Sequence, residues 1–170
     1  MTLAVARRDD PEMLFAVPAI VADRRDDGSI IVRSTVPLSE SARCVGDWLE
    51  HWARQTPNRV FLAERADVTA PWTTVSYADA LRRVRSLASW ILTQGLSADR
   101  PVMILSDNSI DHALLALAAQ HVGVPSAAIS PAYSLMSRDF DKLRAIFDLL
   151  TPGLVFANDG MAFARAIDAI

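Results

Sequence analysis

The sequence has very little cysteine, since Cys44 is the only one in 170 residues. A single thiol cannot form a disulfide within the chain, and it cannot supply the cysteine cluster of a structural metal site. This composition fits a reducing compartment, and we expect the protein to act in the cytoplasm. The N-terminal segment also has no apolar run of the length that a signal peptide needs.

Glycine and lysine are missing where nucleotide-binding loops need them. The closest pair of the six glycines, Gly153 and Gly160, is seven positions apart. A dinucleotide-binding turn needs closely spaced glycines, because the backbone must approach the pyrophosphate. A phosphate-binding loop needs a lysine directly after a glycine, but the only lysine, Lys142, follows Asp141. The Gly-x-Ser-x-Gly turn of serine hydrolases is absent too, so the sequence excludes all three devices.

Charge of one sign is not concentrated anywhere in the chain. There are 17 basic and 20 acidic residues, with a net charge of −3 and 51% hydrophobic residues, which is ample for a core. No basic stripe indicates nucleic-acid binding. The uncharged stretch 113–137 is interrupted by polar residues and by Pro125 and Pro131. We interpret it as a buried helix followed by a buried strand, and we expect no membrane span.

The segment from Pro101 to Phe156 alternates short apolar runs with helical patterns. Strands are predicted at residues 101–105, 124–129 and 153–157, helices at 110–122 and 138–150, and a loop at 130–137. This alternation is typical of an α/β fold, in which helices flank a parallel sheet. Strands that are apolar throughout agree with a sheet covered on both faces.

The chain before this segment predicts a hairpin and two helices. Strand-like runs at 17–22 and 29–34 flank an Asp-Gly turn, which predicts an N-terminal β-hairpin. A helix over 45–55 places Trp48 and Trp52 on one apolar face, so we expect both to anchor the core. Short strands are expected at 60–63 and 73–75, followed by a helix that Ser76 caps. We therefore divide the chain into an N-terminal extension with the hairpin, residues 1–44, and an α/β portion, residues 45–170.

Candidate ligand contacts follow from the rule that ligands bind beyond the carboxyl ends of strands in open α/β sheets. The rule indicates Ser106–Ser109 and Ser130–Ser134, although both segments can equally be helix caps and turns. His112 and His121 would lie on opposite sides of one helix and cannot share a metal ion. The remaining charged clusters are expected to be solvated surface groups: Arg82, Arg83, Arg85, Asp139, Asp141 and Asp148. The sequence pattern therefore indicates no catalytic, cofactor-binding or metal-binding residue.

Three stretches in order carry a resemblance to a known family. They are WLEHWARQTPNRVFLAER, TVSYADALRRVRSLASWILTQGLSADRPVMILSDNS and LALAAQHVGVPSAAISPAYS, within Val45 to about Ala157. Together they resemble the N-terminal part of the adenylate-forming, AMP-binding acyl-CoA ligases. The stretch from Ser130 to Ala157, FLAER and the hairpin most resemble feruloyl-CoA synthetases. Two departures are Ser76-Tyr77, where the family usually has Thr-Tyr, and residues 120–123, where it commonly has Lys-Ala-Gly.

The resemblance implies the first subdomain of the adenylate-forming fold and a two-step ligase. In such enzymes a carboxylic acid, here a ferulate-like aryl acid, reacts with ATP and Mg²⁺ to give an acyl-adenylate, which CoA converts to a thioester. The family's reactive residues lie downstream of the region matched, so no catalytic, cofactor or metal residue carries over. We therefore expect 45–170 to be an incomplete domain that is inactive alone and binds no cofactor itself.

Two further expectations and two alternatives remain. The apolar stripe of a helix over 159–170 is not closed by any polar tail, so Met161, Phe163, Ile167 and Ile170 should be poorly covered and promote self-association. The chain is alternatively a non-catalytic α/β binding or regulatory module. The parent enzyme is alternatively a ligase for another aryl or fatty acid.

Overall fold

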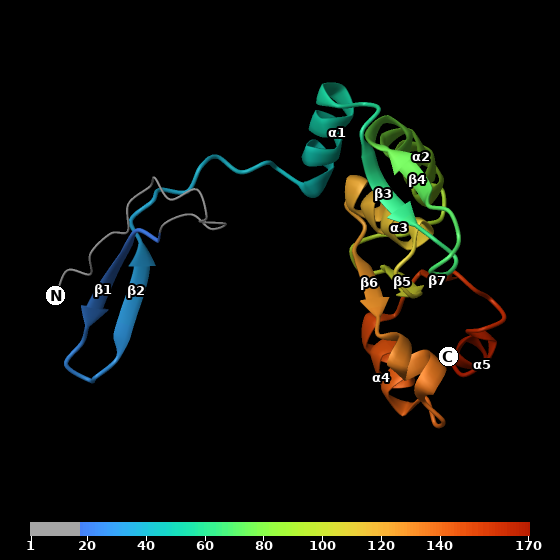
Figure 1. Cartoon of the computed structure of the whole chain (residues 1–170). Helices are drawn as coiled ribbons and strands as arrows, with labels where there is room; N and C mark the ends of the chain where they lie inside the picture. Colours follow the sequence, from blue (N-terminus) through green and yellow to red (C-terminus); the bar gives the residue numbers. More distant parts are fainter. Residues whose placement is uncertain (1–17) are drawn as a thin grey trace. The chain divides into compact units, whose positions relative to one another are not determined.

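The computed structural model describes residues 18–170 (Figure 1). Residues 1–17, which include the first residue of the predicted hairpin, lie outside the described part. The contacts divide the chain into two compact units, one ending at Ser41 and the other running from Ala42 to Ile170. The two units are described separately.

The first unit contains the predicted hairpin. Strands β1 (Ile20–Arg24) and β2 (Ile30–Ser34) pair antiparallel, with Ile20 opposite Ser34. Gly28 has φ of 85°, a left-handed conformation that glycine adopts without steric cost. Asp27 Oδ1 accepts a hydrogen bond from Ser29 N at 2.9 Å and closes the turn. The prediction of a hairpin around Asp-Gly is therefore confirmed.

The second unit is an α/β fold in which an antiparallel β-ribbon and two helices precede a parallel sheet. Its elements in chain order are α1 (Val45–Gln55), β3 (Val60–Glu64), β4 (Thr73–Ser76), α2 (Tyr77–Ile91), β5 (Val102–Leu105), α3 (Ile110–His121), β6 (Ser126–Ile129), the π-helical turn η1 (Ala132–Met136), α4 (Asp141–Leu150), β7 (Leu154–Ala157) and α5 (Ala164–Ile167).

The parallel sheet has the strand order β6-β5-β7, with β5 in the centre. Val102 is opposite Ser126 on one side and Leu154 on the other, and both pairings are parallel. All four residues of β5 are fully buried. This is what its uninterrupted apolar run predicts for a strand covered on both faces.

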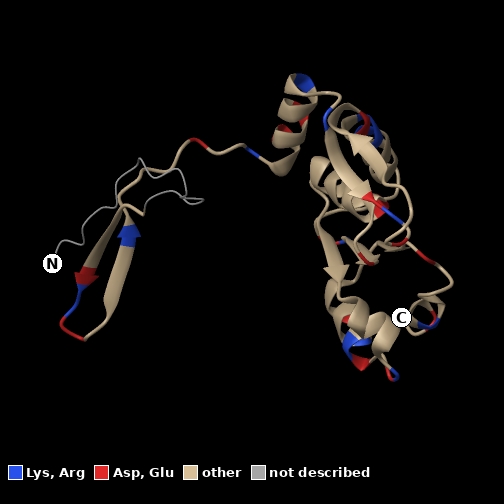
Figure 2. Cartoon of the chain, viewed as in Figure 1, with Lys and Arg blue, Asp and Glu red and all other residues tan. Residues whose placement is uncertain are grey.

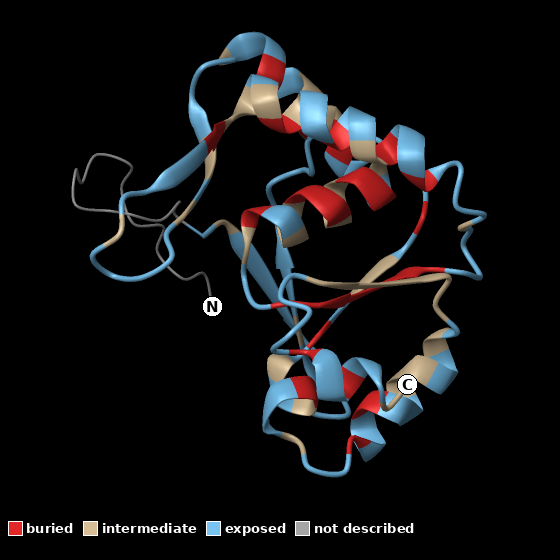
Figure 3. Cartoon of the chain, turned by 90° about the vertical axis from the view of Figure 1, so that its right-hand side faces the viewer, coloured by how far each residue is buried: buried red, intermediate tan, exposed pale blue. Residues whose placement is uncertain are grey.

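Alternate residues of β5 belong to two different cores. Val102 and Ile104 pack with the buried faces of α2 and α3, whereas Met103 and Leu105 pack with α4 and the C-terminal segment. Figures 1 and 3 show the corresponding layers, with α2 and α3 on one face of the sheet and α4 and α5 on the other. Successive side chains of a strand point to opposite faces, so β5 holds the two layers together.

The helix α1 packs in a way that contradicts the prediction for its tryptophans. Trp48 is 53% exposed and Trp52 is 39% exposed, and the buried face consists of Gly46, Leu49 and Ala53. A Cβ atom added to Gly46 would lie only 3.1 Å from the His121 ring. The small residues let α1 approach α3 closely, and this contact turns the bulky aromatic side chains toward solvent.

Three smaller differences concern the C-terminal third. The helix α4 begins at Asp141 rather than at residue 138, because Phe140 adopts a left-handed conformation with φ of 57°. The predicted loop 130–137 contains the turn η1. The helix predicted over 159–170 is the short α5, Ala164–Ile167. The expectation of poor cover is wrong for Phe163, which is 2% exposed, whereas Met161 is 90% and Ile167 39% exposed.

Charged side chains lie on the outside of this fold. Figure 2 shows that the strands of the parallel sheet carry none, while the helices carry both signs. Among the described residues, no helix is long and apolar enough to cross a membrane.

Candidate functional site

The carboxyl end of β5 is the point where the chain path around the sheet reverses. The chain leaves β5 through α3 to reach β6 on one side, and it returns through α4 to β7 on the other side. In doubly wound sheets such a switch point opens a crevice beyond the strand ends. The segment Ser106–Ser109 fills this position, as the sequence predicted.

The N-terminus of α3 is held by two side chains from distant parts of the sequence. Ser109 is the N-cap, and its Oγ accepts a hydrogen bond from His112 N at 3.1 Å. Glu64, at the end of β3, accepts one from Ile110 N through Oε2 at 2.7 Å. Both bonds satisfy amides that have no partner within the helix, and the carboxylate also complements the helix dipole.

A cavity of about 380 Å³, here called the switch-point cavity, lies beyond the ends of β5 and β6. Its lining comes from the two segments that the sequence indicated, from the end of β6 and from α3: Ser106, Asp107, Asn108, His112, Ala128, Ile129, Ser130 and Pro131. Ser106 is 4% exposed, and its hydroxyl donates to the Asp107 carbonyl. His112 Nδ1 lies 3.3 Å from the same carbonyl oxygen. The polar groups of this cavity are thus partly engaged with one another.

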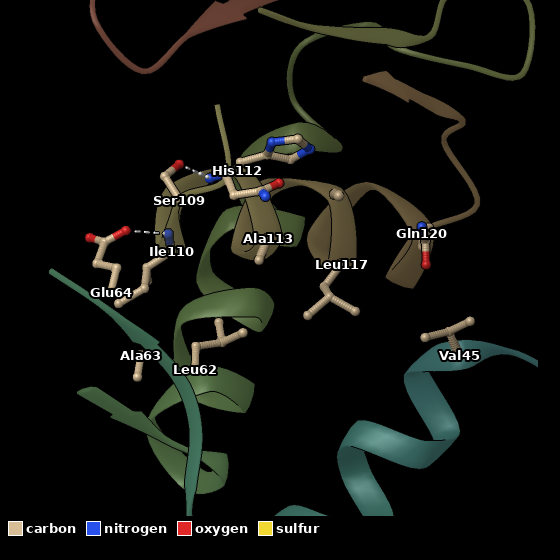
Figure 4. A pocket seen from close by; sticks show the side chains of 12 residues that line it. Val45, Leu62, Ala63, Glu64, Ser109, Ile110, His112, Ala113, Leu117 and Gln120 are labelled. Atoms are coloured by element: carbon tan, nitrogen blue, oxygen red, sulfur yellow. Dashed lines mark hydrogen bonds between the residues drawn. The ribbon is translucent and has the colours of Figure 1, made fainter. Parts of the chain in front are cut away.

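A second hollow of about 610 Å³, here called the α3 groove, runs along the other side of the same helix (Figure 4). It is lined mainly by apolar side chains of α1, β3 and α3, with polar groups near the helix N-terminus: Val45, Leu62, Ala63, Glu64, Asn108, Ser109, Ile110, His112, Ala113, Ala116, Leu117 and Gln120. Figure 4 shows Leu117 pointing into the groove, with Val45 and Leu62 on either side of it. Asn108 and His112 line both hollows.

The residues present do not fit the triphosphate of ATP. Neither lining contains a lysine or an arginine, and both include a carboxylate, Asp107 in the switch-point cavity and Glu64 in the α3 groove. The amide of Ile110, which an anion at the helix N-terminus would need, already donates to Glu64. A polyanion would therefore meet negative charge without compensating cations.

The structure brings together only part of the predicted contact set. Ser106–Asn108, Ser130 and Pro131 line one cavity, but Tyr133 and Ser134 do not. Ser134 is 5% exposed and its hydroxyl has no hydrogen-bond partner. Tyr133 instead lies 5.3 Å from the ammonium of Lys142.

Several residues of the charged clusters form surface ion pairs, as expected of solvated side chains. Arg82 bonds Asp79 at 2.7 Å, and Arg85 reaches across from α2 to Glu50 on α1 at 3.0 Å. The hydrogen bond from Arg85 lowers the pKa of Glu50. Bonds from the Asp141 amide and then from Ser137 lower the pKa of Asp139. These shifts come from exposed ion pairs and caps, which mark local structure rather than a catalytic pair.

Within residues 18–170, no three histidine, cysteine or carboxylate side chains gather closely enough to hold a metal ion. His112 lines the two hollows, whereas His121 lies against α1 near Gly46.

The sequence reasoning missed Glu64 and the α3 groove. The one available signal was an acidic residue directly after an apolar strand pattern, which is the position from which a side chain can reach a neighbouring helix end.

The fold and site define a doubly wound α/β domain whose polar groups at the switch point cap a helix. A family model described as AMP-binding enzyme matches residues 49–166. The match covers more than half of the sequence, so the chain belongs to the AMP-binding enzyme family. A comparison with curated proteins gave no match.

Several solved structures share this fold. A fatty acid AMP ligase from Legionella pneumophila aligns with a TM-score of 0.60 and 16% identity over 68% of this chain and 20% of its own. VinN aligns with a TM-score of 0.60 and 22% identity over 75% of this chain and 30% of its own. The Klebsiella oxytoca NpsA N-terminal subdomain, in complex with anthranilyl-AMSN, aligns with a TM-score of 0.55 and 16% identity over 68% and 28%. The chain thus spans 20–30% of the length of these structures.

Proposed function

We propose that residues 45–170 form the first portion of the large domain of an adenylate-forming acid–thiol ligase. The observation that carries the proposal is the family match over residues 49–166, which coincides with the α/β unit. The parent enzyme would act in the cytoplasm and join a carboxylic acid to CoA, with conversion of ATP to AMP and pyrophosphate and with Mg²⁺ as the metal. Residues 1–44 would be an extension carrying the hairpin.

Within that enzyme the residues of this chain position α3 and support the parallel sheet, and they supply no reactive group. The hydroxyl of Ser109 and the carboxylate of Glu64 hold the start of α3. β5 joins the two helical layers by burying alternate side chains on both faces. Both hollows fit a triphosphate poorly. This supports the proposal that residues outside this portion bind the nucleotide.

For the acid substrate we propose an aryl carboxylate of the ferulate type. The support is the resemblance of Ser130–Ala157 and FLAER to feruloyl-CoA synthetases. The structure of the NpsA subdomain in complex with anthranilyl-AMSN supports the compatibility of an aryl ligand with a related fold. Other aryl acids and fatty acids are the competing substrates, and the Legionella pneumophila ligase in complex with acyl adenylate and pyrophosphate represents the second class.

ATP–pyrophosphate exchange tests the proposal in two arms. The purified chain, supplied with ATP, Mg²⁺ and ferulate, should show no exchange above the protein-free background. The polypeptide encoded by the complete reading frame should catalyse exchange, faster with ferulate than with benzoate or octanoate. Exchange by the 170-residue chain alone would overturn the supporting role. A reading frame that stops after Ile170 would favour the alternative, a non-catalytic binding or regulatory module.

A further inference from the structure

The hairpin of β1 and β2 is open to solvent along both of its strands. Among the described residues the two strands pair only with each other (Figure 1). Every residue of β1 is exposed, and in β2 only Ile31 is partly buried. A hairpin of two strands is only marginally stable in water, and it gains stability from further strands or from a packed face. The hairpin is therefore a candidate interaction surface.

The two faces of the hairpin differ in character. Residues that lie directly opposite each other in an antiparallel pair share a face. One face is mainly apolar and carries three opposed pairs: Ile20 and Ser34, Ala22 and Val32, Arg24 and Ile30. The other face contains the ion pair between Arg33 and Asp23. The single basic side chain of β2 is thus neutralised within its own hairpin.

The outer edge of β2 presents backbone groups that the hairpin does not use. Thr35 N donates to Ala19 O at 2.8 Å, so these two residues form a hydrogen-bonded pair at the open end of the hairpin. Hydrogen-bonded and non-hydrogen-bonded pairs alternate along an antiparallel ladder. Counted back from Thr35, the residues of β2 whose N–H and C=O groups point away from β1 are Ile30, Val32 and Ser34.

The edge of β2 has less protection against pairing than the edge of β1. Natural sheet edges usually carry charged residues or proline, which discourage the addition of strands. The strand β1 contains two charged residues, Asp23 and Arg24, whereas β2 contains only Arg33. β2 also begins with three β-branched residues, which favour strand pairing. Of the two edges, the edge of β2 is therefore the better template for a further strand.

The sequence of β2 is complementary to itself in an antiparallel arrangement about a two-fold axis at Val32. In that register Val32 lies opposite Val32 of the second copy, and Ile30 lies opposite Ser34, so the outward backbone groups of all three residues are matched. Arg33 lies opposite Ile31, so no two like charges are directly opposed. The apolar faces of the two hairpins join into one, because the outward residues of β2 all lie on that face.

We propose that β2 pairs with β2 of a second copy of this chain, which gives a symmetric dimer joined by a four-stranded antiparallel sheet. The contact is isologous, so it closes at two copies. A single strand pair buries far less than the roughly 1,600 Å² of a standard interface, so we expect a weak dimer with a Kd on the order of 10–100 µM. The hairpin precedes the family match at residues 49–166, so the inference does not rest on the proposed function.

Sedimentation velocity of the 170-residue chain over a range of concentrations tests the proposal. The chain should change from monomer to dimer as its concentration rises from the low micromolar to the several-hundred-micromolar range. Val32→Lys places two like charges opposite each other at the axis and should weaken the dimer at least about tenfold. Ala22→Lys is the matched control on the same face at the edge of β1, and it should leave the dimer unchanged. A chain that stays monomeric, a dimer that survives Val32→Lys, or equal effects of the two lysines would overturn the proposal.

A charge-swap experiment tests the position of the two-fold axis. Val32→Lys and Val32→Glu should each be monomeric alone, and an equimolar mixture of the two variants should form a heterodimer. This rescue requires residue 32 of one copy to lie beside residue 32 of the other, and it also shows that the variant hairpins still form. A mixture that remains monomeric while the unmodified chain dimerises would contradict the proposed register.

Hydrogen exchange distinguishes a second copy from a strand of the same chain. The amides of Ile30, Val32 and Ser34 should exchange rapidly in the dilute chain and become protected as the concentration rises, in parallel with the dimer seen by sedimentation. Protection of these amides in the monomer would assign the edge to another strand of the same chain and would overturn the proposal. A dimer without such protection would overturn it as well.

Discussion

The contact between Glu64 and the start of α3 gives a quantitative prediction for stability. Glu64→Ala removes the charged acceptor of the Ile110 amide, and Ile110 is only 5% exposed. A hydrogen bond to a charged group contributes about 1.5–3 kcal/mol, and a buried amide left without a partner carries a cost of similar size. Glu64 is half-buried, so we expect a loss of about 2 kcal/mol in the free energy of unfolding. Glu64→Gln keeps an acceptor and loses the charge at the helix N-terminus, so we expect it to lose about 0.5–1 kcal/mol.

Urea unfolding followed by far-UV circular dichroism measures both losses on the 170-residue chain. Glu40→Ala is the matched control, because it removes an exposed carboxylate from an irregular segment. We expect the order Glu40→Ala, Glu64→Gln, Glu64→Ala in increasing loss of stability. A loss below about 0.5 kcal/mol for Glu64→Ala would refute the capping argument. A larger loss for the glutamine than for the alanine variant would refute it as well.

Three other changes test the packing and the surface pairs. Gly153→Ala should cost about 1 kcal/mol, because Leu96 Cδ2, 2.5 Å from the new Cβ, can rotate away, whereas Arg100 Cβ at 3.1 Å moves only with its backbone; an unchanged thermal midpoint would contradict this. Ser134→Ala should stabilise the chain by about 1 kcal/mol, since it removes a buried hydroxyl without a partner; a loss in urea unfolding would show that the hydroxyl is satisfied. The pKa of Glu50 is lowered by Arg85, so this pair stabilises the fold above the unfolded value of about 4.3 and is lost as pH falls through the lower folded value. Glu50→Gln should therefore weaken the pH dependence of stability below about pH 4.3, and an unaltered dependence would count against the pair.

The parallel sheet could be predicted because its signals are local. Each strand is a short apolar run between turn residues, and Ser109 precedes the apolar helix as a cap should. The orientation of α1 could not be predicted in the same way. Its periodic stripe contains both tryptophans, yet the buried face follows Gly46, which depends on how closely His121 approaches from another helix. Periodicity finds an amphipathic helix, but the neighbouring element decides which side is covered.

Some parts of the candidate site could likewise be predicted from local sequence, whereas others depend on tertiary packing. The rule for strand ends places Ser106–Ser109 beside Ser130 without knowledge of any contact, because parallel strands end at one edge of the sheet. Glu64 lies 46 positions before Ile110, and no local pattern connects them. The α3 groove likewise needs side chains from α1, β3 and α3 at once, so its existence depends on the packing of the ribbon against the helix.

The polar groups near the switch point are engaged in bonds that order the start of α3. Here the Ser109 hydroxyl accepts from the His112 amide, the Ser106 hydroxyl donates to Asp107, and the Glu64 carboxylate accepts from Ile110. The Glu64 bond fixes the start of α3 against β3, and the two serine bonds order the turn between β5 and α3. If the proposed ligase is correct, these residues orient a helix beside the nucleotide chemistry, and their replacement should reduce stability more than it changes the rate per folded molecule.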